Sequence, residues 1–392
     1  MTRARATGLA AVLLFALFAS TAEAADIGNP DDLASVEVHG FASQGFILTT
    51  GNDYIDSGTT KGSFQYSEVG VNVTKQLGDK LRVGLQLFAQ DLGPKGTYSP
   101  QIDWAYVDYR WQDWLGFRAG RLKIPYGLYN EIQDVDAARV PVLLPQSVYP
   151  LQTQQYLFAQ TGAELYGFAR SPGLGAFDYR VFGGTIYLDP NALTPPGTAA
   201  QLAFNVPAVF GERLIWETPL DGLRFAGSAE AIQLDTTAYI TGLMSPLHIT
   251  SQSLLWVGSA EYAAGDWVLT AEYSRWRSRV HSDNPALSPA NFSLAERAYV
   301  MATYRAASWF QPGVYYALFF PNVHDRSGRA NQQHDVAATL RFDITPHWLV
   351  KLEGHYMNGT AGLVSPVDVD GPDVSNLPDQ WAAFFAKTTG YF

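Results

Sequence analysis

The sequence predicts an all-β protein, a transmembrane, antiparallel, up-and-down β-barrel of about sixteen strands. Three observations predict this fold. Apolar residues recur at every second position in segment after segment. Short and long connections alternate along the chain. The chain also begins with an export signal, and no later stretch is apolar and long enough for a membrane-spanning helix.

The composition excludes several classes of protein. The 392 residues include no cysteine and carry a net charge of −11. A chain without cysteine has no disulfide framework and no thiolate metal site, and an acidic chain is a poor nucleic-acid binder. Charged residues make up 16% and aromatic residues 14% of the chain, which is too apolar a balance for disorder. We therefore expect no cofactor, no metal and no nucleic-acid partner.

The N-terminus has the three parts of a secretory signal peptide. Arg3 and Arg5 precede an apolar run over residues 8–18, and small residues follow at 22–24 in an A-x-A arrangement. The run is shorter than the roughly 20 apolar residues that a membrane span needs. We expect residues 1–24 to be removed near Ala24, leaving residues 25–392 as a single transmembrane barrel domain.

The period-two pattern is clear in residues 81–91, where Leu85 and Leu87 share one face and Arg82 and Gln86 the other. The same sorting applies along the chain, least clearly in the eighth and tenth segments. We expect about sixteen strands, over residues 35–49, 63–77, 81–91, 102–111, 115–124, 161–170, 177–187, 209–217, 223–234, 249–263, 267–279, 294–306, 312–320, 334–343, 348–357 and 381–392.

The connections between these segments alternate in length. Tight turns such as residues 78–80 and 112–114 are followed by longer connections such as 92–101 and 125–160. An up-and-down barrel produces this alternation because its tight turns lie at one end and its longer loops at the other. A soluble β-sandwich has no reason to follow it.

The tryptophans favour a membrane barrel, because amphipathic rings collect at the two membrane interfaces. Core aromatics of a soluble β-protein would not cluster beside short turns, as several of these do. We expect interfacial positions for the tryptophans near strand ends, which are Trp104, Trp111, Trp114, Trp216, Trp256, Trp267, Trp276, Trp309, Trp348 and Trp381.

The longest connection carries a family resemblance. Residues 120–131 read GRLKIPYGLYNE, which resembles the G-R-x-K-x-P-x-G element of the sixteen-strand Gram-negative outer-membrane porins. The chain also ends in Phe392, as the last strand of such barrels commonly does. The resemblance implies an outer-membrane location, a third loop that folds into the barrel and narrows the pore, and a homotrimer. Outer-membrane lipid, including lipopolysaccharide, would be a further partner.

The candidate pore residues come from the wall and from this loop. Charges must face the lumen, because Arg or Lys at mid-depth on the lipid face costs roughly 2–4 kcal/mol. On the wall we select Arg82, Asp108, Arg110, Arg180, Arg224, Arg341 and Lys351. In residues 121–139 we select Arg121, Lys123, Glu131, Asp134, Asp136 and Arg139, with a bulge at Gly120 turning Arg121 and Lys123 inward. Opposed charges of the loop would create a transverse field across the pore.

These residues predict a water-filled channel for passive diffusion of small hydrophilic solutes or ions. A preference for anions or carboxylates stays open. One alternative is an outer-membrane barrel enzyme of the lipase or protease type, although the chain contains no H-E-x-x-H or G-x-S-x-G motif. Another is a structural or adhesive barrel, which would want larger loops or repeats. We expect a protein that is not an enzyme.

Overall fold

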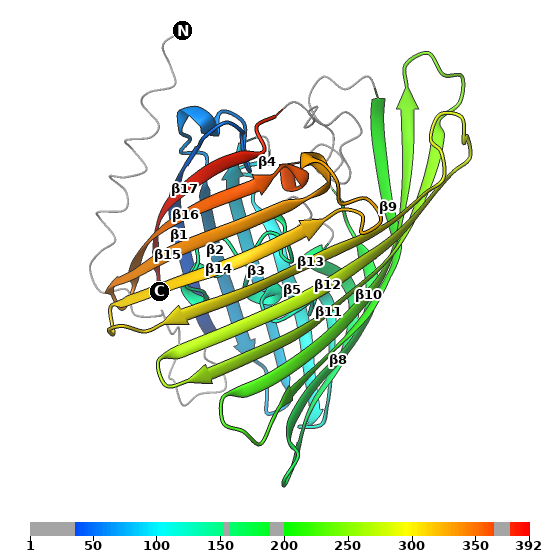
Figure 1. The fold of residues 1–392 in the computed structure, drawn as a ribbon. Coiled ribbons are helices and arrows are strands. Elements are labelled where there is room, and N and C mark those ends of the chain that lie inside the picture. Colours follow the sequence, from blue (N-terminus) through cyan, green and yellow to red (C-terminus); the bar gives the residue numbers. More distant parts are fainter. Residues whose placement is uncertain (1–35, 94, 152–156, 189–199, 364–376) are drawn as a thin grey trace.

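A closed, antiparallel, sixteen-strand β-barrel forms the molecule (Figure 1). The computed structural model describes residues 36–93, 95–151, 157–188, 200–363 and 377–392. Consecutive wall strands pair with each other, and β1 (Val36–Thr49) pairs with β17 (Gln380–Tyr391) to close the barrel, Phe41 lying opposite Tyr391. The predicted fold class is therefore confirmed. The expected signal peptide lies outside the described residues.

The predicted segments each overlap one strand of the wall. The remaining wall strands are β2 (Ser67–Gln76), β3 (Leu81–Leu92), β5 (Gln101–Gln112), β6 (Leu115–Lys123), β7 (Ala159–Ser171), β8 (Gly175–Ile186), β9 (Ala200–Glu217), β10 (Leu223–Ile240), β11 (Leu247–Ala264), β12 (Trp267–Ser282), β13 (Asn291–Tyr304), β14 (Phe310–Phe320), β15 (Gln333–Thr345) and β16 (Trp348–Gly359). A three-residue strand, β4 (Lys95–Thr97), pairs with β3 outside the wall.

The largest difference from the predicted boundaries is in β9 and β10, which have 18 residues each. They extend well beyond the neighbouring strands at the end of the barrel that carries the longer loops (Figure 1). The ladder continues through polar pairs such as Thr237 with His248 and Asp235 with Thr250. Polar residues on both faces hide the period-two signal, so the sequence pattern ends before the strand does.

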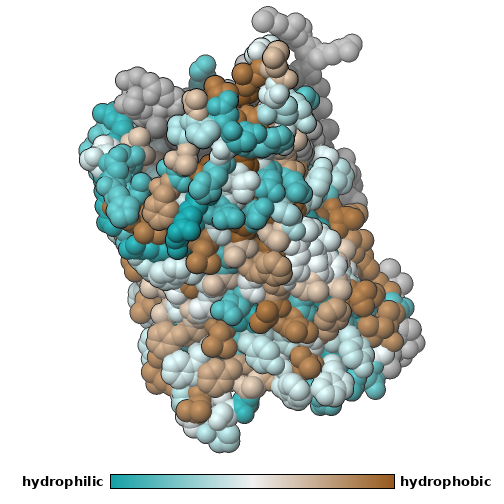
Figure 2. Space-filling view, turned by 90° about the vertical axis from the view of Figure 1, so that its right-hand side faces the viewer, coloured by the Kyte–Doolittle hydropathy of each residue, from teal (hydrophilic) through white to brown (hydrophobic). Residues whose placement is uncertain are grey.

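The wall has one apolar and one polar face, as the alternation predicts. In β3, Leu85 and Leu87 are exposed on the outside, whereas Gln86 between them is 3% exposed in the lumen. Figure 2 shows that hydrophilic side chains gather over the upper part of one side of the barrel, and hydrophobic ones are more frequent below. No helix in the described ranges is long and apolar enough to cross a membrane.

The tryptophans divide between the two faces of the wall. Trp267, Trp309 and Trp348 lie beside short turns and are exposed on the outside, as expected for an interfacial girdle. The expectation is wrong for Trp276 and Trp381, which are buried inside the barrel. Strand parity directs these two rings inward, and parity decides the face whatever the distance to the strand end.

Candidate functional site: the lumen and loop three

Loop three, residues 124–158 between β6 and β7, folds into the barrel. Its described residues bond to inward-facing side chains of distant strands. The Tyr126 hydroxyl lies 2.6 Å from Ser274 Oγ on β12, and the Val142 amide donates to Glu353 on β16 at 2.7 Å. Both strands are far around the wall from β6 and β7, where the loop begins and ends, so the loop crosses the lumen as expected.

The loop backbone is stiff and includes one turn that only glycine fits well. Proline fixes φ, and prolines occur at 125, 141, 145 and 150. Two 3-10 turns follow, η2 (Asn130–Ile132) and η3 (Asp136–Ala138). Gly127 has φ +59°, and a Cβ there would lie 2.4 Å from the Tyr149 hydroxyl. The close approach lets the Tyr149 hydroxyl accept hydrogen bonds from the amides of Leu128 and Tyr129.

A lysine anchor, formed by Lys351 and Lys387, fastens η3 to the last two strands. Lys351 Nζ lies 2.9 Å from Asp136 Oδ1 and donates to the carbonyl oxygens of Asp136 and Arg139, each at 2.7 Å. Lys387 Nζ lies 2.6 Å from Glu68 Oε2 and 3.6 Å from Asp136. Burial alone would raise the pKa of Asp136. The positive charges of Lys351, Lys387 and Arg139 have the larger, opposite effect, so the pKa of Asp136 is held well below its ordinary value.

A glutamate anchor, formed by Glu272 of β12, holds the other side of the loop. This buried carboxylate accepts the Leu128 amide at 3.0 Å and the Tyr149 hydroxyl at 2.5 Å. The hydroxyls of Ser259 and Tyr299 donate to it as well, at 2.5 and 2.7 Å. Four hydrogen-bond donors satisfy the Glu272 carboxylate without a cation. The loop is therefore attached to β12 through a hydrogen-bonded network.

Asp134 and Glu131 join the loop to the strands near its start. Asp134 bonds to Lys123 and to Gln86 Nε2, the latter at 2.7 Å. Glu131 forms ion pairs with Arg180 at 2.5 Å and Arg213 at 2.6 Å. Burial raises the pKa of Glu131, yet the two guanidinium groups lower it more, and its pKa lies below the ordinary value.

Arg180 and Arg213 belong to a larger arginine wall, with one inward-facing arginine on each of seven successive wall strands. Its members are Arg82, Arg110, Arg118, Arg170, Arg180, Arg213 and Arg224, on β3 and β5 to β10. Asp108 pairs with Arg82 at 3.3 Å and with Arg118 at 3.2 Å. The Arg82 side chain keeps 42% of its surface exposed, so part of this wall faces water.

Nearly all predicted residues lie in this network. Four ion pairs join Arg82 to Asp108, Lys123 to Asp134, Arg180 to Glu131, and Arg224 to Glu261, the last at 2.7 Å. Asp136 binds both Arg139 and Lys351. Arg341 donates to the Ala137 carbonyl at 2.7 Å. Arg110 is exposed at the short-turn end. The opposed charges expected of loop three are not separated, because its cations pair with its own anions. That part of the prediction is wrong.

Arg121 does not join the lumen charges. The strand register sets it opposite Ala105 and Thr161, on the outward face, and its guanidinium group donates to the Asp103 carbonyl at 3.1 Å. The register is regular across Gly120, so the predicted bulge is absent there. The irregularity lies in β5 instead, at Asp103. Lys123 reaches inward because β6 ends at that residue and the chain leaves the wall.

Sequence reasoning missed Arg118 and Arg213 as lumen residues. Arg213 lies in one of the two segments with the weakest alternation. Arg118 follows Phe117, and the predicted inward bulge at Gly120 left the phase of this strand undecided. Both have a signal in the register, since Arg118 is paired with Asp108 and Arg213 with Arg180. In the described parts of the chain, no group of three or more His, Asp or Glu is arranged to hold a metal ion.

The fold and site define a β-barrel of the outer-membrane type whose lumen is crossed by an inward loop. No family model and no curated protein sequence matches the chain. Solved structures do match in fold. They include OmpF of Salmonella typhi in complex with daunomycin (15% identity, 93% of this chain and 99% of that chain covered, TM-score 0.57).

Two further structures match at 12% identity, and each match covers 99% of the solved chain. The outer-membrane expressed OmpT of Vibrio cholerae covers 93% of this chain with a TM-score of 0.55. The anion-selective porin from Comamonas acidovorans covers 91% with a TM-score of 0.55. At these identities the likeness shows a shared fold, that of outer-membrane barrels, porins among them.

Proposed function

We propose that the chain is an outer-membrane porin, a passive water-filled channel for small hydrophilic solutes that favours anions. The observation that carries this proposal is the arginine wall of the lumen, in which the Arg82 and Arg110 side chains are exposed to water. Rings of charge and the width of a constriction set the selectivity of such pores. A passive channel needs no catalytic group, so the proposal assigns the chain no enzymatic role.

The exposed arginines of the wall support a preference for anions. Of the seven arginines that face the lumen there, Arg82 and Arg110 keep exposed side chains, whereas Arg180 and Arg213 pair with Glu131. An anion that passes loop three therefore meets guanidinium groups with donors free to bind it.

An outer-membrane location and a trimer complete the proposal. The exported, apolar-faced barrel has the design of an outer-membrane protein, and one of the matching Vibrio cholerae structures is a trimer form. β2 and β3 present exposed Val69, Val71, Leu85 and Leu87 on the outside, a surface that a neighbouring subunit would cover. Cross-linking of the protein in isolated outer membranes tests both the location and the trimer.

Single-channel recording in planar bilayers tests the function. We expect stepwise conducting insertions and, in a KCl gradient, a reversal potential of the sign that indicates chloride preference. R82E should shift that potential toward cations. K61E makes the same charge change in an exposed outer loop and should leave it nearly unchanged. Absence of conducting insertions by the folded protein would overturn the proposal.

A further inference from the structure

β16 presents three titratable side chains to the lumen at alternate positions, Lys351, Glu353 and His355, and each is buried. Lys351 binds carbonyl oxygens of loop three. Glu353 accepts the Val142 amide at 2.7 Å and the Leu143 amide at 2.9 Å. A cation of the strand thus binds carbonyls of the loop and the next inward residue, a carboxylate, binds its amides. The third side chain, His355, binds Glu353.

His355 lies between two carboxylates. Its Nδ1 is 3.0 Å from Asp335 Oδ1 on β15, and its Nε2 is 3.0 Å from Glu353 Oε1. The His355 side chain has no exposed surface. A ring nitrogen without a proton is an acceptor, and so is a carboxylate oxygen, so such a pair forms no hydrogen bond. Both ring nitrogens of His355 therefore donate, which makes the side chain an imidazolium.

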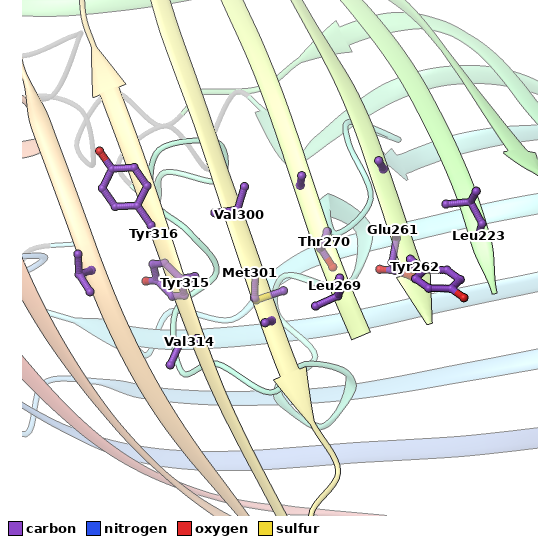
Figure 3. Close-up of a pocket in the computed structure, with 14 residues that line it drawn as sticks. Leu223, Glu261, Tyr262, Leu269, Thr270, Val300, Met301, Val314, Tyr315 and Tyr316 are labelled. Carbon is purple, nitrogen blue, oxygen red and sulfur yellow. The ribbon is translucent and has the colours of Figure 1, made fainter. Parts of the chain in front are cut away.

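The contacts of both acids are those of ionised carboxylates. Glu353 receives three donors, the two loop amides and His355. Asp335 receives His355 and the Tyr315 hydroxyl, the latter at 3.4 Å. Tyr315 belongs to β14 and is buried on the lumen side, whereas its neighbour Tyr316 is exposed on the outside (Figure 3). Because donated hydrogen bonds favour the charged form of a carboxyl group, the shared protons belong to the imidazole ring.

The charge between the two carboxylates comes from His355. Among the described residues, it is the cation within ion-pair distance of Asp335 or Glu353. The Phe385 ring of β17 packs edge-on against the imidazole, with ring centres 5.2 Å apart. The other titratable or charged groups that face the cluster are Tyr54 of the loop after β1, Tyr315 of β14, Lys351 of β16 and Arg139 of loop three. Phenols are neutral at pH 7, and Lys351 and Arg139 bind Asp136.

We propose that His355 is a positioning residue of the channel, an imidazolium that holds Glu353 where it receives the Val142 and Leu143 amides and so keeps this part of loop three against β16. Without the imidazolium, two buried carboxylates would face each other with no cation between them, and such a loss of one partner is strongly destabilising. Glu353 would then turn away from the loop. The inference rests on the proposed porin function only in taking the position of loop three to set the conductance.

The first test measures the charge state of His355 and needs no conduction. The folded, full-length barrel is prepared in detergent with 15N-labelled histidine, and ring nitrogen resonances distinguish imidazolium from imidazole. At pH 7.5, about one unit above the ordinary histidine pKa, roughly nine tenths of an ordinary histidine is neutral. We expect one histidine to keep two protonated ring nitrogens at this pH, and its signals to be absent from H355Q. Neutral-form shifts for every histidine at pH 7.5 would overturn the proposal without any variant.

The second test uses single-channel recording and a charge rescue. H355Q should lose the wild-type conductance level and give larger, noisier openings, because the two carboxylates then lack a cation. D335N/H355Q removes one of those carboxylates as well and should restore the wild-type level. H281Q is the matched control, since it makes the same change at an exposed histidine.

Wild-type conductance in H355Q would overturn the proposal. Failure of D335N/H355Q to restore the conductance would overturn it too, in favour of a role for the ring through its shape alone. A folded barrel that shows the charged His355 and conducts no ions would overturn the porin function, while the imidazolium between Asp335 and Glu353 would stand.

Discussion

Lys351 of β16 and Asp136 of loop three form an ion pair of 2.9 Å in which neither side chain is exposed to water. The same ammonium group also binds the carbonyl oxygens of Asp136, Arg139 and Pro141. One lysine thus recognises both a charge and the backbone path of η3. The position of the loop depends on this contact and on the glutamate anchor on β12.

Replacing Lys351 with methionine should release η3 from the wall. The change leaves buried carbonyls and part of the Asp136 charge unpaired, and breaking a buried pair in this way costs roughly 3–5 kcal/mol. We expect a larger and noisier single-channel conductance and a lower temperature for the heat-induced mobility change on SDS gels. K80M at an exposed short turn is the control. Wild-type conductance in K351M would show that the loop needs no lysine anchor.

Glu131 should reduce the anion preference of the pore, because it neutralises Arg180 and Arg213. E131Q keeps the shape of the side chain and removes its charge. The reversal potential of E131Q in a KCl gradient should therefore move further toward chloride selectivity, opposite in sign to the shift expected for R82E. A shift toward cations would place these arginines outside the ion path.

The lowered pKa of Glu131 predicts a conductance that is stable in mild acid. Its ordinary pKa is 4.5, and the folded value is lower. The contribution of its ion pairs is therefore complete above pH 4.5 and is lost only as the pH falls through the folded value. We expect constant conductance from pH 7 to pH 4.5 and a change below that. A transition centred between pH 5 and pH 7 would contradict this assignment.

Gly120 should be intolerant of any side chain. Its φ is +135°, and a Cβ would lie 2.1 Å from the Ala105 carbonyl oxygen on β5. G120A should break the pairing of β5 with β6 and destabilise the fold by at least about 1–3 kcal/mol, seen as a smaller heat-modifiable fraction after refolding. G227A is the matched control, since a Cβ there meets nothing within 4 Å. Equal yields for the two variants would refute the steric argument.

Much of the wall was predictable, because a barrel with lipid outside and water inside imposes strict alternation on every strand. Leu85, Gln86 and Leu87 show how directly the pattern translates into exposure. The inward path of loop three followed from the family resemblance. Its attachment points did not, since the Val142 and Leu143 amides bind Glu353, a residue about 210 positions away. Nothing local in the sequence encodes such a pairing.

Two errors have physical causes. The inward prediction for Arg121 rests on Leu122 and Ile124 needing the lipid side, yet both of these are buried in the barrel. The Arg121 guanidinium group donates instead to the Asp103 carbonyl, beside an irregular strand pair. The opposed charges of the loop were inferred from spacing, whereas folding of the loop brings Arg139 back to Asp136 at 3.4 Å. Spacing along a loop says little about which charges meet.

The lysine anchor also bears on the order of biogenesis. Lys351 and Lys387 belong to β16 and β17, which the ribosome makes after the other wall strands, and β17 is the strand that completes the ring with β1. Loop three is synthesised earlier, and it cannot bind the lysine anchor until β16 and β17 have been made. Ring completion and narrowing of the passage thus depend on the same C-terminal residues. A barrel that has closed therefore already holds loop three across its pore. A chain truncated before β16 would lack both the β1–β17 pairing and the attachment of loop three.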